Sequence, residues 1–335
     1  MQSYCWAEVS KHLPLVDLLS FEKQIFQGSV PDLSAFFVDK FQRSECWFVI
    51  PHDVMFWDKE YERYVRGIAK FSKVIYFDRG DKPHPLNIPN AIALANSKKS
   101  EFQFSSIIIP YNVMDLGYIP IKQFSPRCSI GFAGYIPPVS LGRLLPRNLS
   151  SIKSPIRSNG LIIRKAGIRS LKRDENQRMF DINIVLRSHY GGAASLINDK
   201  DIFRAEYISN LERSNFIFSP RGDANSSQRL YEAISAGRIP IIPNSQMQLP
   251  KLETTSWSSI FLEVDTFSSN LGKIVSTYWS STTEDQYLDL QKRLRNLYQH
   301  ELDYRVYMKK LFVKGNFRNL IQRRFDQSSK MRFKV

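Results

Sequence analysis

The chain has 335 residues, of which 43% are hydrophobic and 13% aromatic, so two domains with full cores are expected. No run of about 18 apolar residues occurs, which argues against a membrane-spanning helix. Three dispersed cysteines and five dispersed histidines form neither a disulfide framework nor a metal-ligand spacing. These features exclude small disulfide-rich, zinc-binding and integral membrane proteins.

The formal net charge of +15 is uneven along the chain. Leu141–Arg173 contains many lysines and arginines and no acidic residue, and Tyr304–Val335 contains Asp326 as its only acid. Such tracts attract nucleic acid, anionic lipid or a polyanionic polymer. The alternative is a solvated basic face without a single partner.

The first half of the chain alternates between apolar strands and helical patterns. Residues 1–45 have the composition of helices and connectors, and the apolar run Cys46–Ile50 predicts a strand that Pro51 ends. Lys59–Phe71 is helical in pattern, and Lys73–Phe77 and Ser105–Ile109 are further strands. This alternation predicts an open α/β sheet.

A second series of elements follows a connector at residues 112–127. Cys128–Phe132 begins a new strand and leads to Gly134, which allows a ligand or backbone to approach closely; an ordinary turn is the alternative. The basic tract after it is interpreted as a mobile loop over the phosphates of a ligand or as a contact with a second substrate. Asp181–Leu186 is a strand, and Ile202–Arg213 is a helix.

Asp199 and Asp201 form a D-x-D pattern, in which two carboxylates could hold a metal. Because a helical pattern begins directly after it, we interpret it as the start of a helix.

The stretch Ser214–Val264 carries the strongest signal. Asn215–Ser219 is an apolar strand, Ser226 and Ser227 suit a helix N-cap, and Gly237 suits the end of that helix. Ile239–Ile242 is the next strand. In a parallel sheet, the loop between such a strand and helix lies where ligands bind.

This loop suits an anion. A helix N-terminus offers unpaired N–H groups, Arg221 precedes it, and Gly222 allows close approach. Arg229 and Glu232 are three residues apart on the helix, so we expect both on one side, with the cation near phosphates and the carboxylate near sugar hydroxyls. A surface loop with an internal Arg229–Glu232 ion pair is the alternative.

The order of these residues resembles the exostosin family of glycosyltransferases. The resemblance rests on three segments, Ser219-Pro220-Arg221-Gly222, Ser227-Gln228-Arg229-Leu230-Tyr231-Glu232-Ala233 and Ala236-Gly237-Arg238-Ile239-Pro240, with Leu249-Pro250 and Trp257 after them. In the first half, Phe48–Pro51, Tyr76–Asp78 and Ile108–Tyr111 fit the family more weakly. Arg238 and Lys251 depart from the pattern, where the family often has cysteine and an aromatic residue.

The resemblance implies an α/β, GT-B-like fold with two Rossmann-like domains facing a cleft and a C-terminal helix crossing back. We expect an acceptor-side domain at residues 1–120, a donor-side domain at 125–283, and a C-terminal helix with a basic tail at 284–335. The helix is expected over Glu284–Tyr307, with four buried positions: Tyr287, Leu290, Leu294 and Leu297.

The implied function is a metal-independent, inverting glycosyltransferase that uses a nucleotide-diphosphate sugar, with UDP favoured over GDP, and a glycan or other hydroxyl acceptor. No cofactor is expected. The expected donor-binding residues are Gly134, Arg221, Gly222, Ser226, Ser227, Arg229 and Glu232. Asp53 is the expected catalytic base, and His52, Asp78 and Asp115 are the other candidates.

Two other functions remain open. One is a catalytically inactive exostosin-like scaffold or subunit partner, and the other is a basic nucleic-acid-binding protein, although no nucleic-acid-binding motif supports it. The N-terminal residues carry Glu8 and Asp17 and no continuous apolar segment, so they predict no signal peptide. We therefore expect a cytoplasmic enzyme or a shortened form of a longer one. The basic tail Tyr304–Val335 is expected to contact an anionic membrane surface.

Overall fold

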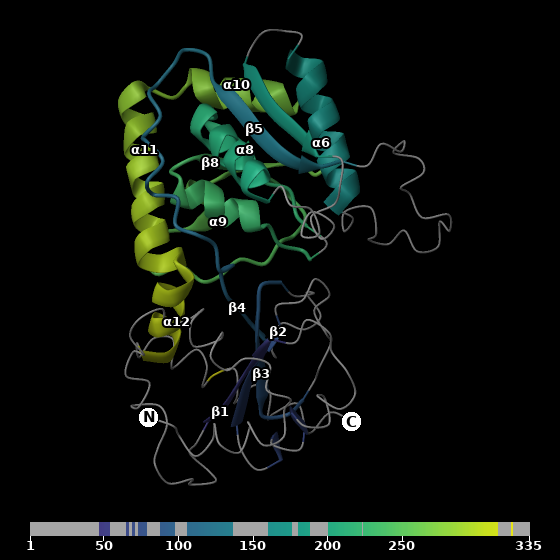
Figure 1. Ribbon diagram of the computed structural model, residues 1–335, viewed down its shortest axis with the longest axis vertical. Helices are drawn as coiled ribbons and strands as arrows, with labels where there is room; N and C mark the ends of the chain where they lie inside the picture. The colour runs from purple at the N-terminus through teal and green to yellow at the C-terminus, as the bar shows by residue number, and fades with distance from the viewer. Residues whose placement is uncertain are drawn as a thin grey trace, which may run out of the picture. The chain divides into compact units, whose positions relative to one another are not determined.

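The computed structural model describes residues 47–53, 65–66, 69–70, 73–78, 88–97, 106–136, 160–175, 180–187, 200–222, 224–313 and 323 (Figure 1). The chain divides into two compact units. Unit 1 comprises Met1–Tyr111, Gln248–Lys251 and Tyr304–Val335, and unit 2 comprises Asn112–Met247 and Leu252–Asp303. The predicted elements in residues 1–45 and most of Lys59–Phe71 lie outside the described residues.

Unit 1 contains a four-stranded parallel sheet. Its strands are β1 (Trp47–Asp53), β2 (Lys73–Asp78), β3 (Ala91–Ala95) and β4 (Ser106–Ile108), in the order β1-β2-β3-β4. The three predicted strands are confirmed, but the prediction that Pro51 ends the first is wrong, because β1 continues to Asp53. Strand β3 is an additional one. Its sequence, AIALA, is buried at every position, as a central parallel strand covered on both faces requires.

Unit 2 contains a five-stranded parallel sheet in the order β6-β5-β7-β8-β9. Its strands are β5 (Ser129–Tyr135), β6 (Asp181–Arg187), β7 (Phe216–Phe218), β8 (Ile239–Pro243) and β9 (Leu262–Val264). Its helices are α6 (Gly160–Glu175), α8 (Lys200–Arg213), α9 (Gln228–Ser235), α10 (Leu271–Ser280) and α11 (Glu284–Leu297), with a short 3₁₀ helix at Trp257–Ser259.

Alternate side chains of β7 assign these helices to the two faces of the sheet. Ile217 joins a buried cluster with residues of α8 and α9. Phe216 makes an edge-on contact with Trp279 of α10, and Phe218 packs so closely on Gly167 of α6 that a Cβ there would lie 2.2 Å from its ring. Because successive side chains of a strand point to opposite faces, α8 and α9 cover one face and α6 and α10 the other.

The strand order creates a topological switch point between β5 and β7. Strand β6, which follows β5 in the chain, lies on one side of β5, and strands β7, β8 and β9 lie on the other. In such doubly wound sheets, ligands bind beyond the carboxyl ends of the two strands at the switch point. The predicted residues Gly134 and Arg221-Gly222 lie at the ends of β5 and β7.

The predicted helix Glu284–Tyr307 is not continuous. It consists of α11, a π-helical turn at Tyr298–Leu302, and α12 (Tyr304–Val313), with Asp303 in an extended conformation between the last two. The start of α11 is fixed by a capping box between Thr283 and Gln286. The four predicted buried positions are buried, so the core-facing stripe is confirmed although the continuous helix is wrong.

The π-helical turn binds two segments of unit 2 that are followed or preceded in the chain by unit 1, and it leads into unit 1 itself. The Tyr298 hydroxyl donates to the Val113 carbonyl at 2.9 Å, close to the passage at residues 111–112. The Glu301 carboxylate accepts from the amides of Glu253 and Thr254 at 2.5 and 3.1 Å, close to the passage at residues 251–252. The turn itself directly precedes the last of the four passages, after Asp303.

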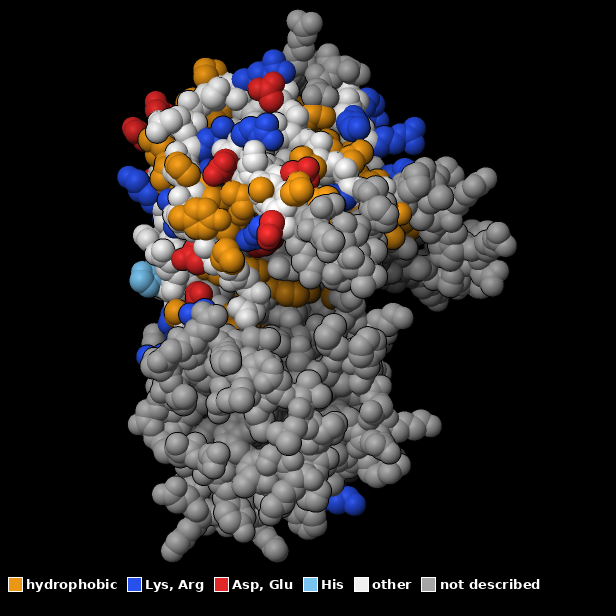
Figure 2. All heavy atoms as spheres, in the orientation of Figure 1, with side chains coloured by type: hydrophobic (Ala, Val, Ile, Leu, Met, Phe, Trp, Pro, Cys, Tyr) orange, Lys and Arg blue, Asp and Glu red, His pale blue; other side chains and the backbone are white. Residues whose placement is uncertain are grey.

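The interpretation of the first basic tract as a loop is wrong for its second half. Residues 160–175 form α6, whose apolar side is buried, while Arg169, Lys172 and Arg173 are exposed. Figure 2 shows Lys and Arg side chains gathered over this helix. Residues 141–159 lie outside the described residues, as does nearly all of the chain beyond Val313.

The connector at residues 112–127 packs within unit 2. Its backbone binds Gln291 of α11 and Arg238, and Phe124 stacks on Trp279 at 5.0 Å. Two α/β units with parallel sheets confirm the expected α/β class, and the C-terminal helix α12 is grouped with unit 1. Among the described residues, no helix has the length and apolar character needed to span a membrane.

Candidate functional site

The loop after β7 is compact and buried. Arg221 is 7% exposed, and the Gly222 amide donates to the Ser226 carbonyl at 2.8 Å, which closes the loop on itself. Gly160, the first residue of α6, lies so close that a Cβ there would be 2.3 Å from the Gly222 carbonyl oxygen. From α6, a terminal nitrogen of Arg164 also approaches the Arg221 carbonyl at 3.4 Å. The loop therefore lies beside the N-terminal end of α6.

The N-terminus of α9 begins at the end of the same loop. Ser227 is its N-cap residue, with extended backbone, as predicted, but its hydroxyl makes no capping hydrogen bond. That hydroxyl is buried, since Ser227 is only 3% exposed, and it has no hydrogen-bond partner among the described residues. A buried polar group without a partner is costly and points to a ligand or water that supplies one. Ser226, 2% exposed, contributes its carbonyl to the loop.

Arg229 reaches from α9 to the end of β5. Its Nε and one terminal nitrogen donate to the Ala133 carbonyl at 3.1 and 2.9 Å, and its guanidinium lies 5.0 Å from the centre of the Phe132 ring. A Cβ on Gly134 would lie 2.4 Å from the same terminal nitrogen. Glycine at position 134 therefore provides the space that the Arg229 guanidinium occupies.

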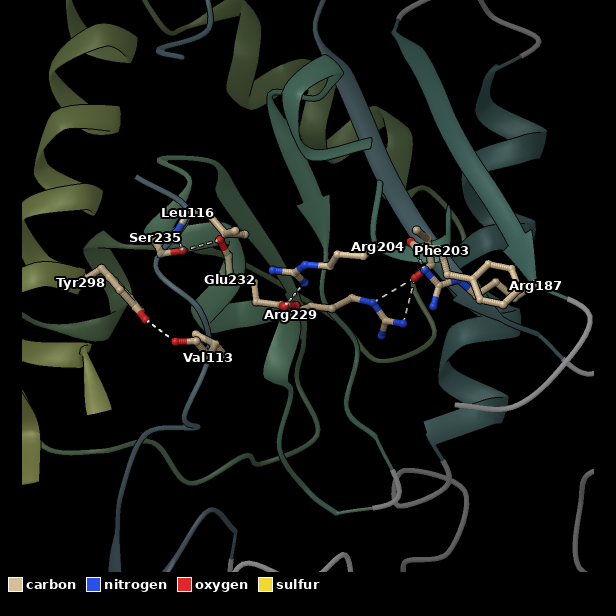
Figure 3. A network of polar contacts seen from close by, with 10 residues as sticks. Val113, Leu116, Arg187, Phe203, Arg204, Arg229, Glu232, Ser235 and Tyr298 are labelled. Atoms are coloured by element: carbon tan, nitrogen blue, oxygen red, sulfur yellow. Dashed lines mark hydrogen bonds and ion pairs between the residues drawn. The ribbon is translucent and has the colours of Figure 1, made fainter. Parts of the chain in front are cut away.

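Glu232 is a buried carboxylate on α9, 6% exposed. Its Oε1 accepts from Arg204 of α8 at 2.8 Å, so the ion pair is made between helices (Figure 3). Desolvation, followed by the negative charge of Glu232, raises the pKa of the buried Tyr207 well above its ordinary value. Desolvation, followed by the positive charge of Arg229, lowers the pKa of Arg187, which ends β6. Among the described residues, Arg187, Arg204 and Arg229 therefore lie near Glu232, and Glu206 is a second carboxylate near Arg187.

The candidate bases lie in different places. Asp53 and His52 are at the carboxyl end of β1 in unit 1, where the side chains are not described. Asp78 ends β2 and is 3% exposed. Asp115 is exposed in the connector of unit 2, where its Oδ1 accepts from the Gly117 amide at 2.8 Å. The sequence-predicted base therefore remains a prediction.

The D-x-D pattern falls at a helix start. Helix α8 begins at Lys200, and Asp201 is exposed in its first turn. Within the part of the chain that the structure describes, no three His, Cys, Asp or Glu side chains form a group that could hold a metal ion.

Comparison with protein families matches residues 150–277 to the Exostosin GT47 domain. This region of the chain is therefore similar to the exostosin GT47 domain, in agreement with the sequence motif. The match contains all the donor-binding candidates described above except Gly134, and it contains none of the candidate bases. No curated protein matches the chain. Among solved structures, the crystal structure of TarM aligns with a TM-score of 0.35 and 13% identity, over 84% of this chain and 50% of that chain. The chain thus spans half of the TarM chain.

Several residues at the site of this exostosin domain were not predicted. Arg204 and Arg187 belong to no motif, and Arg164 was only one member of a basic tract. Arg238, the departure from the family pattern, is 1% exposed and binds the Leu211 carbonyl, the Pro120 carbonyl and Gln291 at 2.9 Å each. Its role is therefore structural. Only the pairing of α8 with α9 in space could have indicated Arg204.

Proposed function

We propose that this protein is an inverting, metal-independent glycosyltransferase that moves a sugar from a nucleotide-diphosphate sugar, UDP-linked in preference to GDP-linked, to a glycan or other hydroxyl acceptor. One observation carries the proposal. In the region that matches the exostosin GT47 domain, the buried Arg221 and the N-terminus of α9 lie at the switch point of the sheet. At that N-terminus, the Ser227 hydroxyl lacks a partner among the described residues.

The leaving group defines what this site must do. As the bond between the anomeric carbon and the β-phosphate oxygen breaks, its electron pair stays on the nucleotide diphosphate. Arg221 and the N-terminal N–H groups of α9 would stabilise that charge, because preorganised donors in a water-poor site act strongly on developing charge. Arg229 would contribute its cation at the end of β5. Because these groups supply positive charge, the mechanism requires no metal.

The acceptor side of the reaction is assigned by resemblance. The acceptor oxygen forms a bond to the anomeric carbon on the face opposite the leaving group, which inverts its configuration. Its proton passes to a base, for which Asp53 is the first candidate. Glu232 would accept hydrogen bonds from ribose hydroxyls of the donor.

Nucleotide binding provides the first test. We expect UDP at saturating concentration to raise the melting temperature of the full chain by several degrees, because a ligand at about 100 times its Kd stabilises by about 2.7 kcal/mol. Arg221→Ala should abolish this shift while the protein without nucleotide melts normally. Arg293→Ala is the matched control, because Arg293 pairs with Asp289 on an exposed surface of α11.

Turnover provides the second test. Asp53→Asn should preserve the UDP shift and remove sugar transfer, measured as nucleotide release from a panel of UDP- and GDP-sugars in EDTA. Nucleotide binding without any release would indicate the inactive scaffold. A melting shift given only by a DNA oligomer, and lost in high salt, would instead indicate a nucleic-acid-binding protein and refute the proposal.

A further inference from the structure

The buried carboxylate of Glu232 has its counter-charge on another helix. Glu232 lies in the middle of α9, and its side chain is 8% exposed, while the side chain of its partner Arg204 is 36% exposed. A carboxylate that is removed from water requires a paired cation or strong hydrogen bonds. Because Arg204 lies on α8, the direction of the Glu232 carboxylate depends on how these two helices pack on the sheet.

Arg204 is itself held in place. Its guanidinium lies 5.5 Å from the centre of the Tyr207 ring, which is one turn further along α8 and 5% exposed. Stacking on an aromatic ring orients the planar guanidinium, and two N–H groups of a guanidinium define a direction that a lysine ammonium does not. The pair is therefore an oriented contact between two helices at the carboxyl edge of the sheet (Figure 3).

We propose that Arg204 is a positioning residue that fixes the Glu232 carboxylate for recognition of the ribose hydroxyls of the donor nucleotide. The inference rests on the proposed function. Arg204 engages Oε1 at 2.8 Å, and the Tyr207 side chain is also a hydrogen-bonding neighbour of Glu232. An ionised carboxylate has about four acceptor sites on its two oxygens, so it can accept a ribose hydroxyl as well. A carboxylate held in one orientation loses less entropy when it binds, so its hydrogen bonds contribute more to affinity.

The test compares UDP with 2′-deoxy-UDP, which lacks one ribose hydroxyl. The ratio of the two Kd values, measured by calorimetry on the full chain, isolates recognition of the ribose from binding of the diphosphate. For the wild type we expect a ratio of at least about ten, since one hydrogen bond to a charged group is worth about 1.5–3 kcal/mol. In Arg204→Ala the ratio should fall to about one or two.

Three further variants separate positioning from folding. Arg204→Lys keeps the charge and should restore part of the ratio. Glu232→Gln should lower the ratio by itself, and adding Arg204→Ala to Glu232→Gln should lower it no further, because Arg204 acts through Glu232. Arg293→Ala, which disrupts an exposed ion pair, should leave the ratio at the wild-type value.

The outcomes are distinct. If Arg204→Ala or Arg204→Lys melts at a lower temperature but keeps the wild-type ratio, Arg204 stabilises the fold only and the inference is wrong. A wild-type ratio near one, with firm UDP binding, removes the ribose role of Glu232 and overturns the inference while the proposed function stands. Absence of UDP and GDP binding in the wild type refutes the proposed function, and the inference with it.

Discussion

Arg238 is predicted to be the most important single polar side chain for the stability of unit 2. It is 1% exposed and donates to three different segments: the end of α8 at Leu211, the connector at Pro120, and Gln291 of α11. Burial lowers the pKa of Arg238 from its ordinary value to about 10, so the guanidinium is charged at neutral pH despite its desolvation. Replacing it with alanine leaves these acceptors without their donor.

The expected cost follows from these contacts. A buried acceptor without its partner costs about 1–3 kcal/mol of the free energy of unfolding. Water that enters the vacated space restores part of the lost hydrogen bonding and reduces this cost. We therefore expect Arg238→Ala to lower the free energy of unfolding by about 3–5 kcal/mol. Arg238→Met, which keeps most of the volume, should cost less than alanine because only the hydrogen bonds are lost.

The assay is urea unfolding followed by tryptophan fluorescence and circular dichroism, with the midpoint and slope fitted for each transition. Arg293→Ala is the control and should cost no more than about 1 kcal/mol, because its ion pair is exposed. A loss of less than about 1 kcal/mol for Arg238→Ala would refute the argument that Arg238 ties the three segments together.

Three more predictions concern single sites. Burial raises the pKa of the Cys128 thiol from 9.0 to about 12. The contribution of this thiol to the free energy of unfolding is therefore complete below pH 9.0 and is lost as the pH rises toward about 12. Cys128→Ala should reduce that decline, measured as the urea midpoint at each pH. Gly134→Ala places a Cβ 2.4 Å from a terminal nitrogen of Arg229, a flexible group, so we expect UDP affinity to fall about tenfold in calorimetry with little change in melting temperature. Unchanged affinity would contradict the placement of Arg229 in the donor site. Glu301→Gln replaces one carboxylate oxygen with an NH2 group, which cannot accept a hydrogen bond from the loop at Thr254. We expect faster hydrogen exchange in that loop and unchanged exchange in β7.

Local patterns predicted most of the elements in the described part of unit 2. The run Asn215–Ser219 and the strand Ile239–Ile242 are β7 and β8 within one or two residues, because fully apolar runs are typical of strands buried on both faces. Gly237 ends α9 with φ +68°, as predicted for a left-handed C-terminal residue. These features depend on neighbouring residues only.

Other elements depend on contacts that a local pattern does not contain. Helix α6 was not predicted because its basic residues suggested a solvated tract. In the structure, Gly167 packs against Phe218 of β7, and the isoleucines of α6 are buried. The helix is interrupted at Asp303, although the sequence pattern on both sides of Asp303 is helical. There the interactions of Tyr298 and Glu301 with distant segments set where the helix changes form.

For the site, the sequence by itself determined the motif: Arg221, Gly222, Ser227 and Arg229 around the start of a helix, in the order of the exostosin GT47 family. Residues close in sequence share one loop and one helix turn, so their proximity needed no tertiary information. Only the tertiary structure decided which partners they have. The strand order brings β5 beside β7, which places Gly134 against Arg229, and the packing of α8 on α9 pairs Glu232 with Arg204. Such pairings join residues far apart in the chain, and their distances are fixed by how the sheet and helices pack.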